Sequence, residues 1–239
     1  MSYNYQQSAK DEERVGAMFD AIAHRYDFLN HVLSLGIDKY WRKTTVNTII
    51  KNNPFKILDI ATGTADLAIA TASKSQICTI TALDISKEML YIAERKIKDK
   101  GLHKRIQLIQ ASALALPFEN NTFDAISIAF GIRNFKDIDM GLTEIYRVLK
   151  LKGQLYVLEF SKPKNKIIKA LYHIYFSKIL PFIGNLISGH KYAYSYLNKS
   201  AVEFPDGVTF IEILSKNRFE HITQKRMSFG IATLYVARK

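Results

Sequence analysis

The chain has 239 residues, of which 48% are hydrophobic, so it is long enough to bury a large core as one domain of ordinary size. With 34 basic and 22 acidic residues it carries a net charge of +12, which favours contact with nucleic acid or an anionic lipid surface but selects neither. The single cysteine, Cys78, excludes an intrachain disulfide and is expected to be a small buried side chain in a reducing, intracellular setting.

The N-terminal part, residues 1–51, is predicted to form a helical cap. Its start, MSYNYQQSAKDEER, lacks the basic-then-apolar pattern of a secretory signal, so export is not expected. Over residues 15–51 apolar side chains recur at helical spacing, with a turn near Gly36. Tyr26 and Trp41 are expected to be core aromatics.

Apolar runs of strand length follow, and helical patterns separate most of them. This alternation predicts an α/β fold: a three-layer, Rossmann-like sheet, mostly parallel, with crossover helices on both faces. The chain after Arg218 predicts two strands joined around residues 228–230, an antiparallel hairpin at one sheet edge. The apolar runs cover residues 55–60, 77–84, 106–110, 123–130, 154–160 and 231–237.

Two of the intervening helices are well marked. One follows Asp84, with Ser86 as its N-cap and Gly101 as its stop signal. The other precedes Gly153 and places Ile138, Leu142, Ile145 and Leu149 at helical spacing. Both helices are expected to pack one apolar face on the sheet.

Residues 162–200 are predicted to form an inserted helical lid. Their segment KIIKALYHIYFSKILPFIGNLI interleaves lysines with aliphatic and aromatic residues, which is typical of a helix resting on a lipid surface. A pair of helices packed on the sheet is the alternative. Lysines, a histidine and a proline interrupt residues 167–187, so these fall short of the roughly 20 apolar residues of a spanning helix. We find no repeats or linkers, so residues 1–239 are expected to form a single domain.

Candidate ligand-binding residues follow four of the predicted strands. Gly63 and Thr64 follow the first strand, Asp84 ends the second, residues 112–113 follow the third and residues 131–134 the fourth. In open α/β sheets ligands bind beyond the carboxyl ends of the strands, where the strand order reverses. Glycine lets the backbone approach a ligand, and a carboxylate ending the second strand can reach ribose hydroxyls. The pattern predicts an adenosine-type cofactor.

The turn after the first strand argues against a dinucleotide. It has Ala61 and Ala65 instead of further glycines of the dinucleotide fingerprint, so a pyrophosphate is not expected on the following helix. A cofactor with adenosine but no phosphate fits better. No set of His, Cys, Asp and Glu has metal-ligand spacing, so no metal is expected.

Here the sequence resembles a known family. ILDIATGTADLA followed by LDIS resembles the first two cofactor motifs of class I S-adenosylmethionine-dependent methyltransferases. MFDAIAHRYDFLNHVLSLGIDKYWR and RVLKLKGQLYVLEFS resemble the two signatures of the ubiquinone/menaquinone C-methyltransferase family, and ALPFENNTFDAISIAFGIRNFKD matches the segment between them. The resemblance covers nearly the whole chain. It implies a seven-stranded sheet with an antiparallel last strand and S-adenosylmethionine as cofactor.

Carried over to this chain, the resemblance implies that Thr64, Asp84, Ser112 and Ala113 contact S-adenosylmethionine. Asp84 would hold the ribose hydroxyls, Ser112 and Ala113 would lie along the adenine, and Asp59 and Gly63 would shape the methionine end. Several positions depart from the family pattern. Ser112 replaces Asp or Asn, Ala129 a serine, Ala65 the second glycine of the turn, Asp38 a histidine, and residues 151–152 a Pro-Gly pair.

The resemblance also implies C-methylation of a polyprenylated quinol in respiratory quinone biosynthesis, with demethylmenaquinol to menaquinol as the first expectation. A quinol ring carbon becomes nucleophilic when a neighbouring hydroxyl loses its proton, and it then attacks the sulfonium methyl group in line. Arg133 is our catalytic candidate, because a guanidinium can lower the pKa of that hydroxyl or orient a water. Alternatively, Arg133 caps its loop or pairs with Asp137. His24, Tyr26 and Asp27 are further candidates.

Two alternative functions remain open: a methyltransferase of the same fold acting on another small or lipidic substrate, and a basic nucleic-acid-binding protein. FGIRNF lacks the Asn/Asp-Pro-Pro-aromatic or cysteine motif of a nucleic-acid methyltransferase, so no nucleic-acid partner is expected. We expect a cytoplasmic protein in peripheral contact with the inner face of the cell membrane, with the polyprenyl tail held by the lid. The ring type, the tail length, the proton acceptor and a homodimer remain open.

Overall fold

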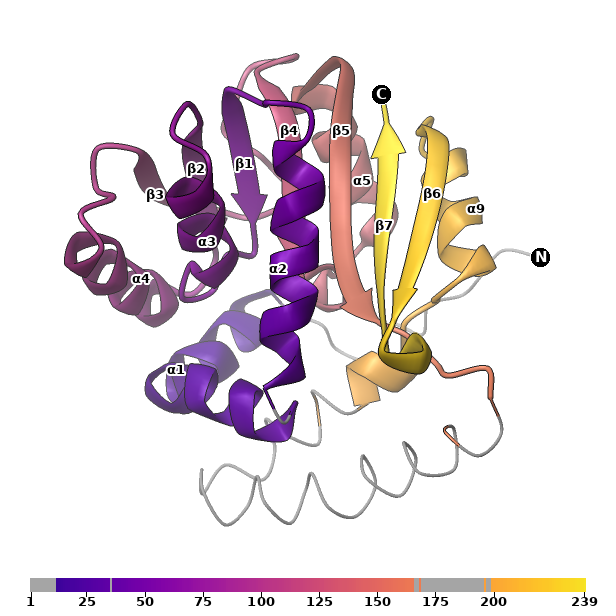
Figure 1. Cartoon of the computed structure of the whole chain (residues 1–239), viewed down its shortest axis with the longest axis horizontal. Helices are drawn as coiled ribbons and strands as arrows, with labels where there is room; N and C mark the ends of the chain where they lie inside the picture. Colours follow the sequence, from indigo (N-terminus) through magenta and orange to yellow (C-terminus); the bar gives the residue numbers. More distant parts are fainter. Residues whose placement is uncertain (1–11, 35, 166–167, 169–195, 197–198) are drawn as a thin grey trace.

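One seven-stranded sheet forms the centre of the protein, in the order β3-β2-β1-β4-β5-β7-β6 (Figure 1). The computed structural model describes residues 12–34, 36–165, 168, 196 and 199–239. Strands β1 to β5 are parallel, and β7 runs antiparallel to both β5 and β6. The predicted sheet and its C-terminal hairpin are therefore confirmed. The strands are β1 (Lys56–Ile60), β2 (Thr79–Asp84), β3 (Ile106–Gln110), β4 (Phe123–Ala129), β5 (Leu149–Phe160), β6 (Glu220–Met227) and β7 (Ala232–Arg238).

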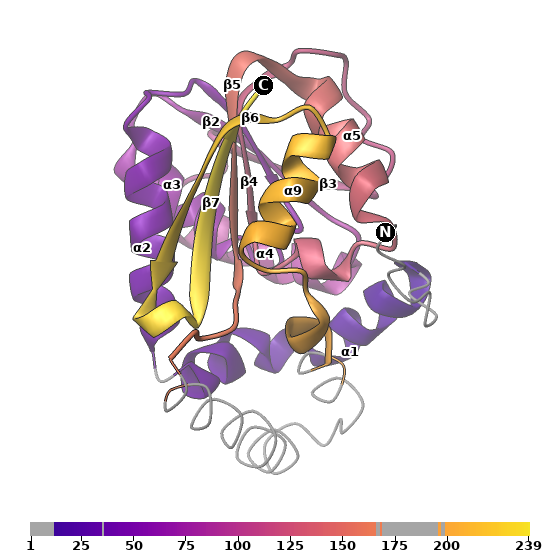
Figure 2. The same cartoon turned by 90° about the vertical axis from the view of Figure 1, so that its right-hand side faces the viewer.

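Helices cover both faces of the sheet, so the fold has three layers (Figure 2). Ile49, Ala68 and Ile97, from α2, α3 and α4, share one buried cluster on the first face. Leu142 and Leu214, from α5 and α9, belong to the cluster on the other face. The helices are α1 (Glu12–Leu33), α2 (Ile37–Ile50), α3 (Asp66–Lys74), α4 (Lys87–Asp99), η1 (Ile132–Asn134), α5 (Ile138–Val148), α9 (Val208–Lys216) and η3 (Ser228–Gly230).

Helix α4 forms as its sequence predicts. The Ser86 hydroxyl caps it by accepting a hydrogen bond from the Met89 amide at 3.1 Å. Met89, Ala93 and Ile97 are buried, since residues three or four apart share a helix face. The helix ends before Gly101, whose φ of 66° lies in the left-handed region that favours glycine.

Strand β5 is longer than predicted. It begins at Leu149, which was expected to end the preceding helix, and it precedes the predicted start at residue 154. Leu149 pairs with Phe123 of β4, an interaction between distant segments that no local pattern contains. The adjoining helix α5 accordingly ends at Val148. Cys78 is buried, as predicted.

The two N-terminal helices have different surroundings. Helix α2 packs against α3 and β5 on one face of the sheet, whereas α1 crosses the end of the sheet and contacts α4 (Figure 1). In the described part of the predicted cap, residues 12–34 and 36–51, α1 covers the strand ends and α2 does not. Most of the predicted lid, 162–200, lies outside the described residues, as do His173 and His190. Within the described ranges we find no helix with the length and apolar sequence needed to span a membrane.

Candidate active site

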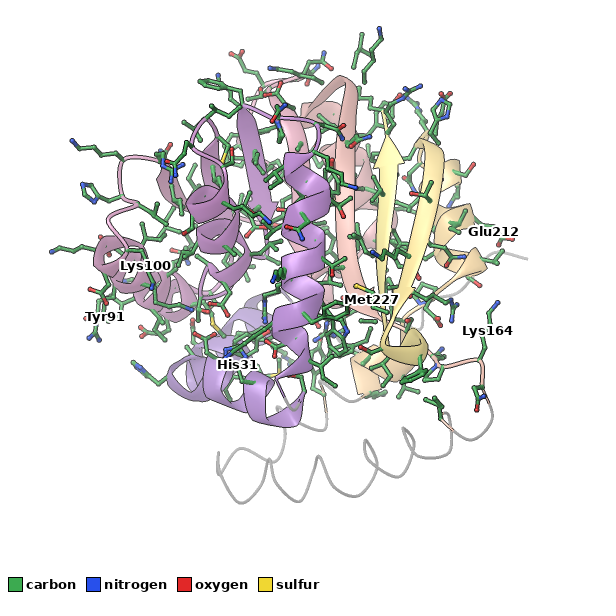
Figure 3. The ribbon with its side chains drawn as sticks, in the orientation of Figure 1. His31, Tyr91, Lys100, Lys164, Glu212 and Met227 are labelled. Carbon is green, nitrogen blue, oxygen red and sulfur yellow. The ribbon has the colours of Figure 1, made fainter. Side chains whose placement is uncertain are left out.

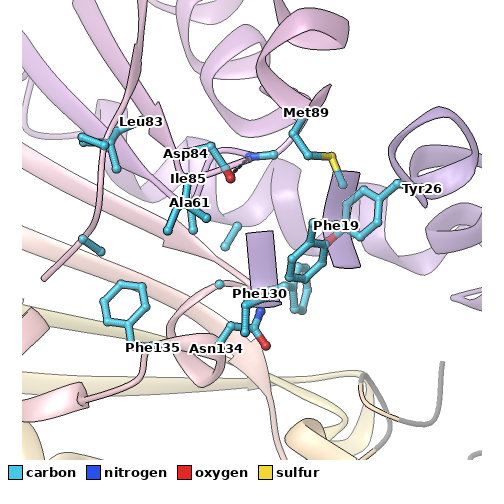
Figure 4. Close-up of a pocket in the computed structure, with 16 residues that line it drawn as sticks. Phe19, Tyr26, Ala61, Leu83, Asp84, Ile85, Met89, Phe130, Asn134 and Phe135 are labelled. Carbon is cyan, nitrogen blue, oxygen red and sulfur yellow. Dashed lines mark hydrogen bonds between the residues drawn. The ribbon is translucent and has the colours of Figure 1, made fainter. Parts of the chain in front are cut away.

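A cavity opens where the strand order reverses, beyond the carboxyl ends of β1, β2 and β4 (Figure 4). Its empty space measures about 680 Å³, a volume that includes the part open to solvent. Helix α1 forms one wall, and the segments after β1, β2, β3 and β4 form the others. Its described lining residues are Val15, Phe19, Tyr26, Ala61, Gly63, Leu83, Asp84, Ile85, Met89, Ala111, Ala113, Ala129, Phe130, Gly131, Asn134 and Phe135.

The turn after β1 has an unusual backbone. Ala61, Gly63 and Ala65 all have positive φ, at 52°, 56° and 65°. Only Gly63 adopts this left-handed region without a steric penalty. The turn is anchored by a hydrogen bond from the Thr62 amide to the Leu83 carbonyl oxygen at 2.9 Å, which ties it to β2. The turn therefore adopts a left-handed backbone beside the cavity although alanines stand at two of its three positions with positive φ.

Asp84 places a carboxylate at the cavity wall, as predicted. Its Oδ2 accepts a hydrogen bond from the Gly63 amide at 2.7 Å, and its Oδ1 accepts one from the Ser86 amide at 2.9 Å. Burial raises the pKa of Asp84, although these amide hydrogen bonds counteract the rise. Each carboxylate oxygen has a second lone pair, so Asp84 can accept further hydrogen bonds from a ligand hydroxyl.

Asp59 lies below the turn and does not line the cavity. Its carboxylate is 2% exposed and accepts hydrogen bonds from the Ser127 and Thr62 hydroxyls, each at 2.6 Å. Burial raises the pKa of Asp59 to about 6, against the opposing effect of these hydrogen bonds. Asp59 therefore supports the turn from the protein interior.

Thr64 joins a polar network that connects α1 to the body of the protein. Its hydroxyl donates to Asp27 Oδ1 at 2.5 Å and accepts from Lys96 Nζ at 3.1 Å. Lys96 also forms ion pairs with Asp27 and Asp66. The Thr64 side chain is 3% exposed and is not among the described lining residues. Its hydroxyl holds α1 across the strand ends.

The two residues after β3 differ. Ala113 lines the cavity, whereas the Ser112 hydroxyl accepts a hydrogen bond from the Leu114 amide at 3.0 Å and closes the local turn. Of the predicted residues, the structure thus brings Gly63, Asp84, Ala113, Gly131 and Asn134 to the cavity. Asp59, Thr64 and Ser112 lie behind the lining residues and do not reach the cavity with their side chains.

Arg133 lies beneath the loop after β4. Its guanidinium is 3% exposed, and Nη1 donates to the Phe130 carbonyl oxygen at 2.6 Å and to Glu159 Oε1 at 2.7 Å. The predicted alternative partner, Asp137, instead caps α5 by accepting from the Met140 amide at 2.9 Å. Arg133 therefore caps its loop and pairs with Glu159, and it is not among the described lining residues.

Sequence reasoning missed several lining residues. Val15 and Phe19 line it from the same helix, α1, as the further candidate Tyr26, and their helical spacing was the available signal. Asn134 follows Arg133 directly, and its Oδ1 is buried with no hydrogen-bond partner in the described structure. Figure 4 shows Asn134 and Phe130 together, on the opposite side of the cavity from Asp84. Asn134 was one of the candidates at residues 131–134, but a single sequence gives no reason to rank it above its neighbours.

The described lining is mostly apolar and holds one charged side chain, Asp84. No lysine, arginine or histidine is among these residues, so the cavity is poorly suited to a phosphate group. Within the described part of the chain, no cluster of three or more His, Cys, Asp and Glu side chains could hold a metal ion. The arrangement suits a cationic or hydroxyl-bearing ligand together with an apolar one.

Solved structures share this fold at low sequence identity. A putative S-adenosyl-L-methionine-dependent methyltransferase from Methanococcus maripaludis is 23% identical, with a TM-score of 0.62 over 92% of this chain and 94% of that one. Human N-acetylserotonin methyltransferase in complex with SAM is 17% identical, with a TM-score of 0.62 over 90% of this chain and 55% of that one.

Sequence relatives are much closer. A demethylmenaquinone methyltransferase from Bacteroides fragilis is 42% identical over 98% of this chain and 96% of its own length. A ubiquinone/menaquinone biosynthesis C-methyltransferase UbiE from Geotalea uraniireducens is 43% identical over 95% of this chain and 97% of its own. The model of the ubiE/COQ5 methyltransferase family matches residues 6–239, and the chain belongs to that family.

Proposed function

We propose that this protein transfers a methyl group from S-adenosylmethionine to a ring carbon of a polyprenylated quinol in respiratory quinone biosynthesis. The first expected reaction converts demethylmenaquinol to menaquinol, in line with relatives named demethylmenaquinone methyltransferase that are 41–42% identical. One observation carries the proposal. The cavity at the sheet's switch point is apolar, and Asp84 is the one charged group among its described lining residues.

The residues of the cavity fit S-adenosylmethionine. Asp84 would hold the ribose hydroxyls through the lone pairs that the Gly63 and Ser86 amides leave free. Ala113 would lie along the adenine, and Gly63 with Asp59 beneath it would shape the methionine end. The acidic surroundings favour a cation, whereas the lack of basic side chains among the described lining residues disfavours a phosphate. When bound, the cofactor would supply an electrophilic methyl group, because its sulfonium sulfur is a good leaving group as a neutral thioether.

Thr64 and Ser112 remain proposed cofactor neighbours. Since the Thr64 hydroxyl is bonded to Asp27 and Lys96, and the Ser112 hydroxyl to the Leu114 amide, we expect them to act mainly through the main chain. Their substitutions should therefore weaken cofactor binding less than a substitution of Asp84.

The quinol would occupy the apolar side of the cavity. Phe19, Phe130 and Phe135 exclude water there, which strengthens every polar interaction with the reacting ring. Asn134 Oδ1 is buried without a partner in the described structure, so it is available to a quinol hydroxyl. Among the further candidates of the N-terminal segment, Tyr26 lines the cavity, whereas Asp27 pairs with Lys96.

For Arg133 we propose a positioning role. Its guanidinium holds the Phe130 carbonyl oxygen and the Glu159 carboxylate, and Phe130 and Asn134 on the same loop line the cavity. A neutralised ion pair exerts a weak field on the quinol, so Arg133 would act by fixing this loop beside the reacting ring. Direct contact of its guanidinium with the quinol is the alternative, and a loss of turnover without a shift of its pH profile would favour positioning.

The test is to incubate the protein with labelled S-adenosylmethionine and a bacterial lipid extract containing demethylmenaquinol, and to identify the product by mass. We expect labelled menaquinol, and much less of it with Asp84→Ala when S-adenosylmethionine is limiting. Label in another lipid would support the same-fold alternative, and label in added nucleic acid would support the nucleic-acid alternative. Either result without a methylated quinone would overturn the proposal.

A cytoplasmic location, peripheral contact with the inner face of the cell membrane and a homodimer are further proposals. The net charge of +12 supports contact with an anionic lipid surface, and a polyprenylated substrate requires access to a bilayer. Co-sedimentation with anionic liposomes at low salt tests the contact, and light scattering tests the dimer.

A further inference from the structure

The loop between β6 and β7 displays an aromatic side chain to solvent. Phe229 in η3 is 79% exposed, more than any other large hydrophobic residue in the described structure. Ser228 and Phe229 have φ of 47° and 59°, in the left-handed region that costs a residue with a side chain about 1–2 kcal/mol. Glycine or asparagine would adopt this backbone more readily. The loop therefore combines a strained backbone with a phenyl ring that is exposed to water.

The loop is fixed in place. Trp41 of α2, which is 2% exposed, donates from Nε1 to Ser228 Oγ at 2.8 Å. On the other side of the loop, the Ser161 hydroxyl donates to the Gly230 carbonyl oxygen at 2.8 Å, and the Ser161 amide donates to the Ile231 carbonyl oxygen at 2.8 Å. The exposure of Phe229 is therefore a feature of a well-anchored turn.

Two more exposed apolar side chains lie on the first turn of α2. Ile37 is 39% exposed and Tyr40 is 54% exposed. Ile37 precedes Trp41 by one helical turn and Tyr40 adjoins it, so both are near the point where Trp41 meets the η3 loop. Figures 1 and 2 show η3 close to this end of α2. We call Ile37, Tyr40 and Phe229 the η3 patch.

Three exposed lysines lie on the segments that carry or adjoin the η3 patch. Lys39 lies between Ile37 and Tyr40 in sequence, Lys164 follows β5 and Lys225 lies near the end of β6, and all three are exposed. No described carboxylate forms an ion pair with any of them; the nearby Asp206 pairs with Arg226 at 3.5 Å. Figure 3 shows Lys164 extending outward at the lower right, on the far side of η3 from α2. The surface is both apolar and basic.

The η3 patch shares one end of the sheet with the cavity. Ala232, next to η3, pairs with Phe160 at the carboxyl end of β5. Between the patch and the cavity lies a cluster of three rings, Trp41, Phe130 and Phe160, with centroids 4.7–6.1 Å apart. Phe130 lines the cavity itself. A surface in contact with the patch therefore lies on the cavity's side of the molecule.

We propose that the η3 patch docks on an anionic lipid bilayer, with Phe229 and Tyr40 at the headgroup level and the lysines beside anionic headgroups. Aromatic side chains flanked by lysines match that environment in chemistry and charge. A second copy of the chain fits less well. A stable interface buries about 800 Å² per partner, far more than these three side chains provide, and two lysine-rimmed patches repel each other. The inference rests on the proposed function, because a polyprenylated quinol resides in a bilayer.

The test uses co-sedimentation with vesicles of phosphatidylglycerol and phosphatidylcholine. Phe229→Ala should weaken binding roughly tenfold, the loss expected when a phenyl ring no longer leaves water. Leu151→Ala is the matched control, because Leu151 is 75% exposed at the opposite end of β5 and should bind as the parent does. Higher salt should weaken binding by all three proteins. Calorimetric titration with S-adenosylmethionine checks that each is folded.

Equal vesicle binding by the parent and Phe229→Ala would overturn the inference, as would an equal loss in Leu151→Ala. A change of oligomeric mass in Phe229→Ala without a change in vesicle binding would assign the patch to a contact between copies and overturn it too. A water-soluble quinol with a truncated tail separates the two proposals. Phe229→Ala should methylate it like the parent. If the parent methylates no quinol while its vesicle binding still depends on Phe229, the proposed function fails and the docking inference stands.

Discussion

Arg133 and Glu159 form an ion pair with 2.7 Å between Nη1 and Oε1, and their side chains are only 3% and 0% exposed. Glu159 belongs to β5 and Arg133 to the loop after β4, so the pair fastens the loop that borders the cavity to the neighbouring strand. Burial raises the pKa of Glu159, and the positive charge of Arg133 opposes that rise.

Removing one member of this pair should be costly. Arg133→Ala leaves the Glu159 carboxylate buried without its counter-charge, so the free energy of unfolding should fall by about 3–5 kcal/mol. The double variant Arg133→Met/Glu159→Leu removes both charges and should lose less than Arg133→Ala. Urea denaturation of the parent, Arg133→Ala and the double variant measures their free energies of unfolding. A double variant less stable than Arg133→Ala would contradict the interpretation.

Turnover should depend on Arg133 more than cofactor binding does. Arg133→Ala releases the loop that carries Asn134, and a misplacement of about 1 Å at a reacting centre costs about a hundredfold in rate. S-adenosylmethionine affinity, measured by calorimetry, should change little because Asp84 lies on the other side of the cavity. Asp137→Ala is the control, since it removes only the α5 cap and should leave turnover unchanged. Equal losses of turnover and affinity in Arg133→Ala would count against a role in the reaction.

Asp84 should determine cofactor affinity. Asp84→Ala removes an acceptor for the ribose hydroxyls, and hydrogen bonds to a charged group contribute about 1.5–3 kcal/mol, so affinity should fall about ten- to hundredfold. Thr64→Ser, which keeps the hydroxyl bonded to Asp27, is the control and should bind nearly as well. Calorimetric titration measures both. Unchanged affinity in Asp84→Ala would exclude the ribose assignment.

Asp59 should make stability depend on pH. Its folded-state pKa of about 6 exceeds the ordinary value of 3.8, so the folded protein binds more protons between these pH values. The contribution of Asp59 to the free energy of unfolding therefore falls as pH rises from about 4 to about 6, by about 3 kcal/mol in total. Asp59→Asn does not titrate, so it should gain stability relative to the parent over this window.

Urea denaturation at several pH values between 4 and 7 measures the difference. Ser127→Ala provides a second check, because losing this hydrogen-bond donor should raise the Asp59 pKa and extend the window to higher pH. A constant difference between the parent and Asp59→Asn across the whole range would show that Asp59 does not titrate there.

Lys152 offers a stabilising substitution. It stands where the family pattern has glycine, and its φ of 64° lies in the left-handed region. Lys152→Gly relieves about 1–2 kcal/mol of backbone strain and loses about 0.4–1 kcal/mol to the freer unfolded chain, so a net gain of up to about 1 kcal/mol is expected. Thermal unfolding should show a melting temperature about 2–4 °C higher. Leu151→Gly, at a neighbour without positive φ, should lower it instead.

Much of the fold follows from local sequence patterns. Apolar runs predicted most strand positions, and the Ser86 cap predicted where α4 begins. The start of β5 was missed because Leu149 joins the sheet by pairing with Phe123, which depends on a strand far away in the sequence. The sequence also did not predict that α2 packs on the sheet whereas α1 lines the cavity. Both helices have apolar faces, and only tertiary packing decides what each face contacts.

The sequence by itself determined the class of fold, the family and the strand ends at which ligand-binding residues would lie, because periodicity and turn residues are local properties of the chain. Tertiary structure alone decided which of these side chains reach the cavity. Gly63, Asp84 and Ala113 do so, whereas Thr64 and Arg133 are already bonded to Asp27 and Glu159. The physical reason is that most buried polar groups bond to a partner that folding brings to them, and for Thr64 and Arg133 that partner comes from a distant segment.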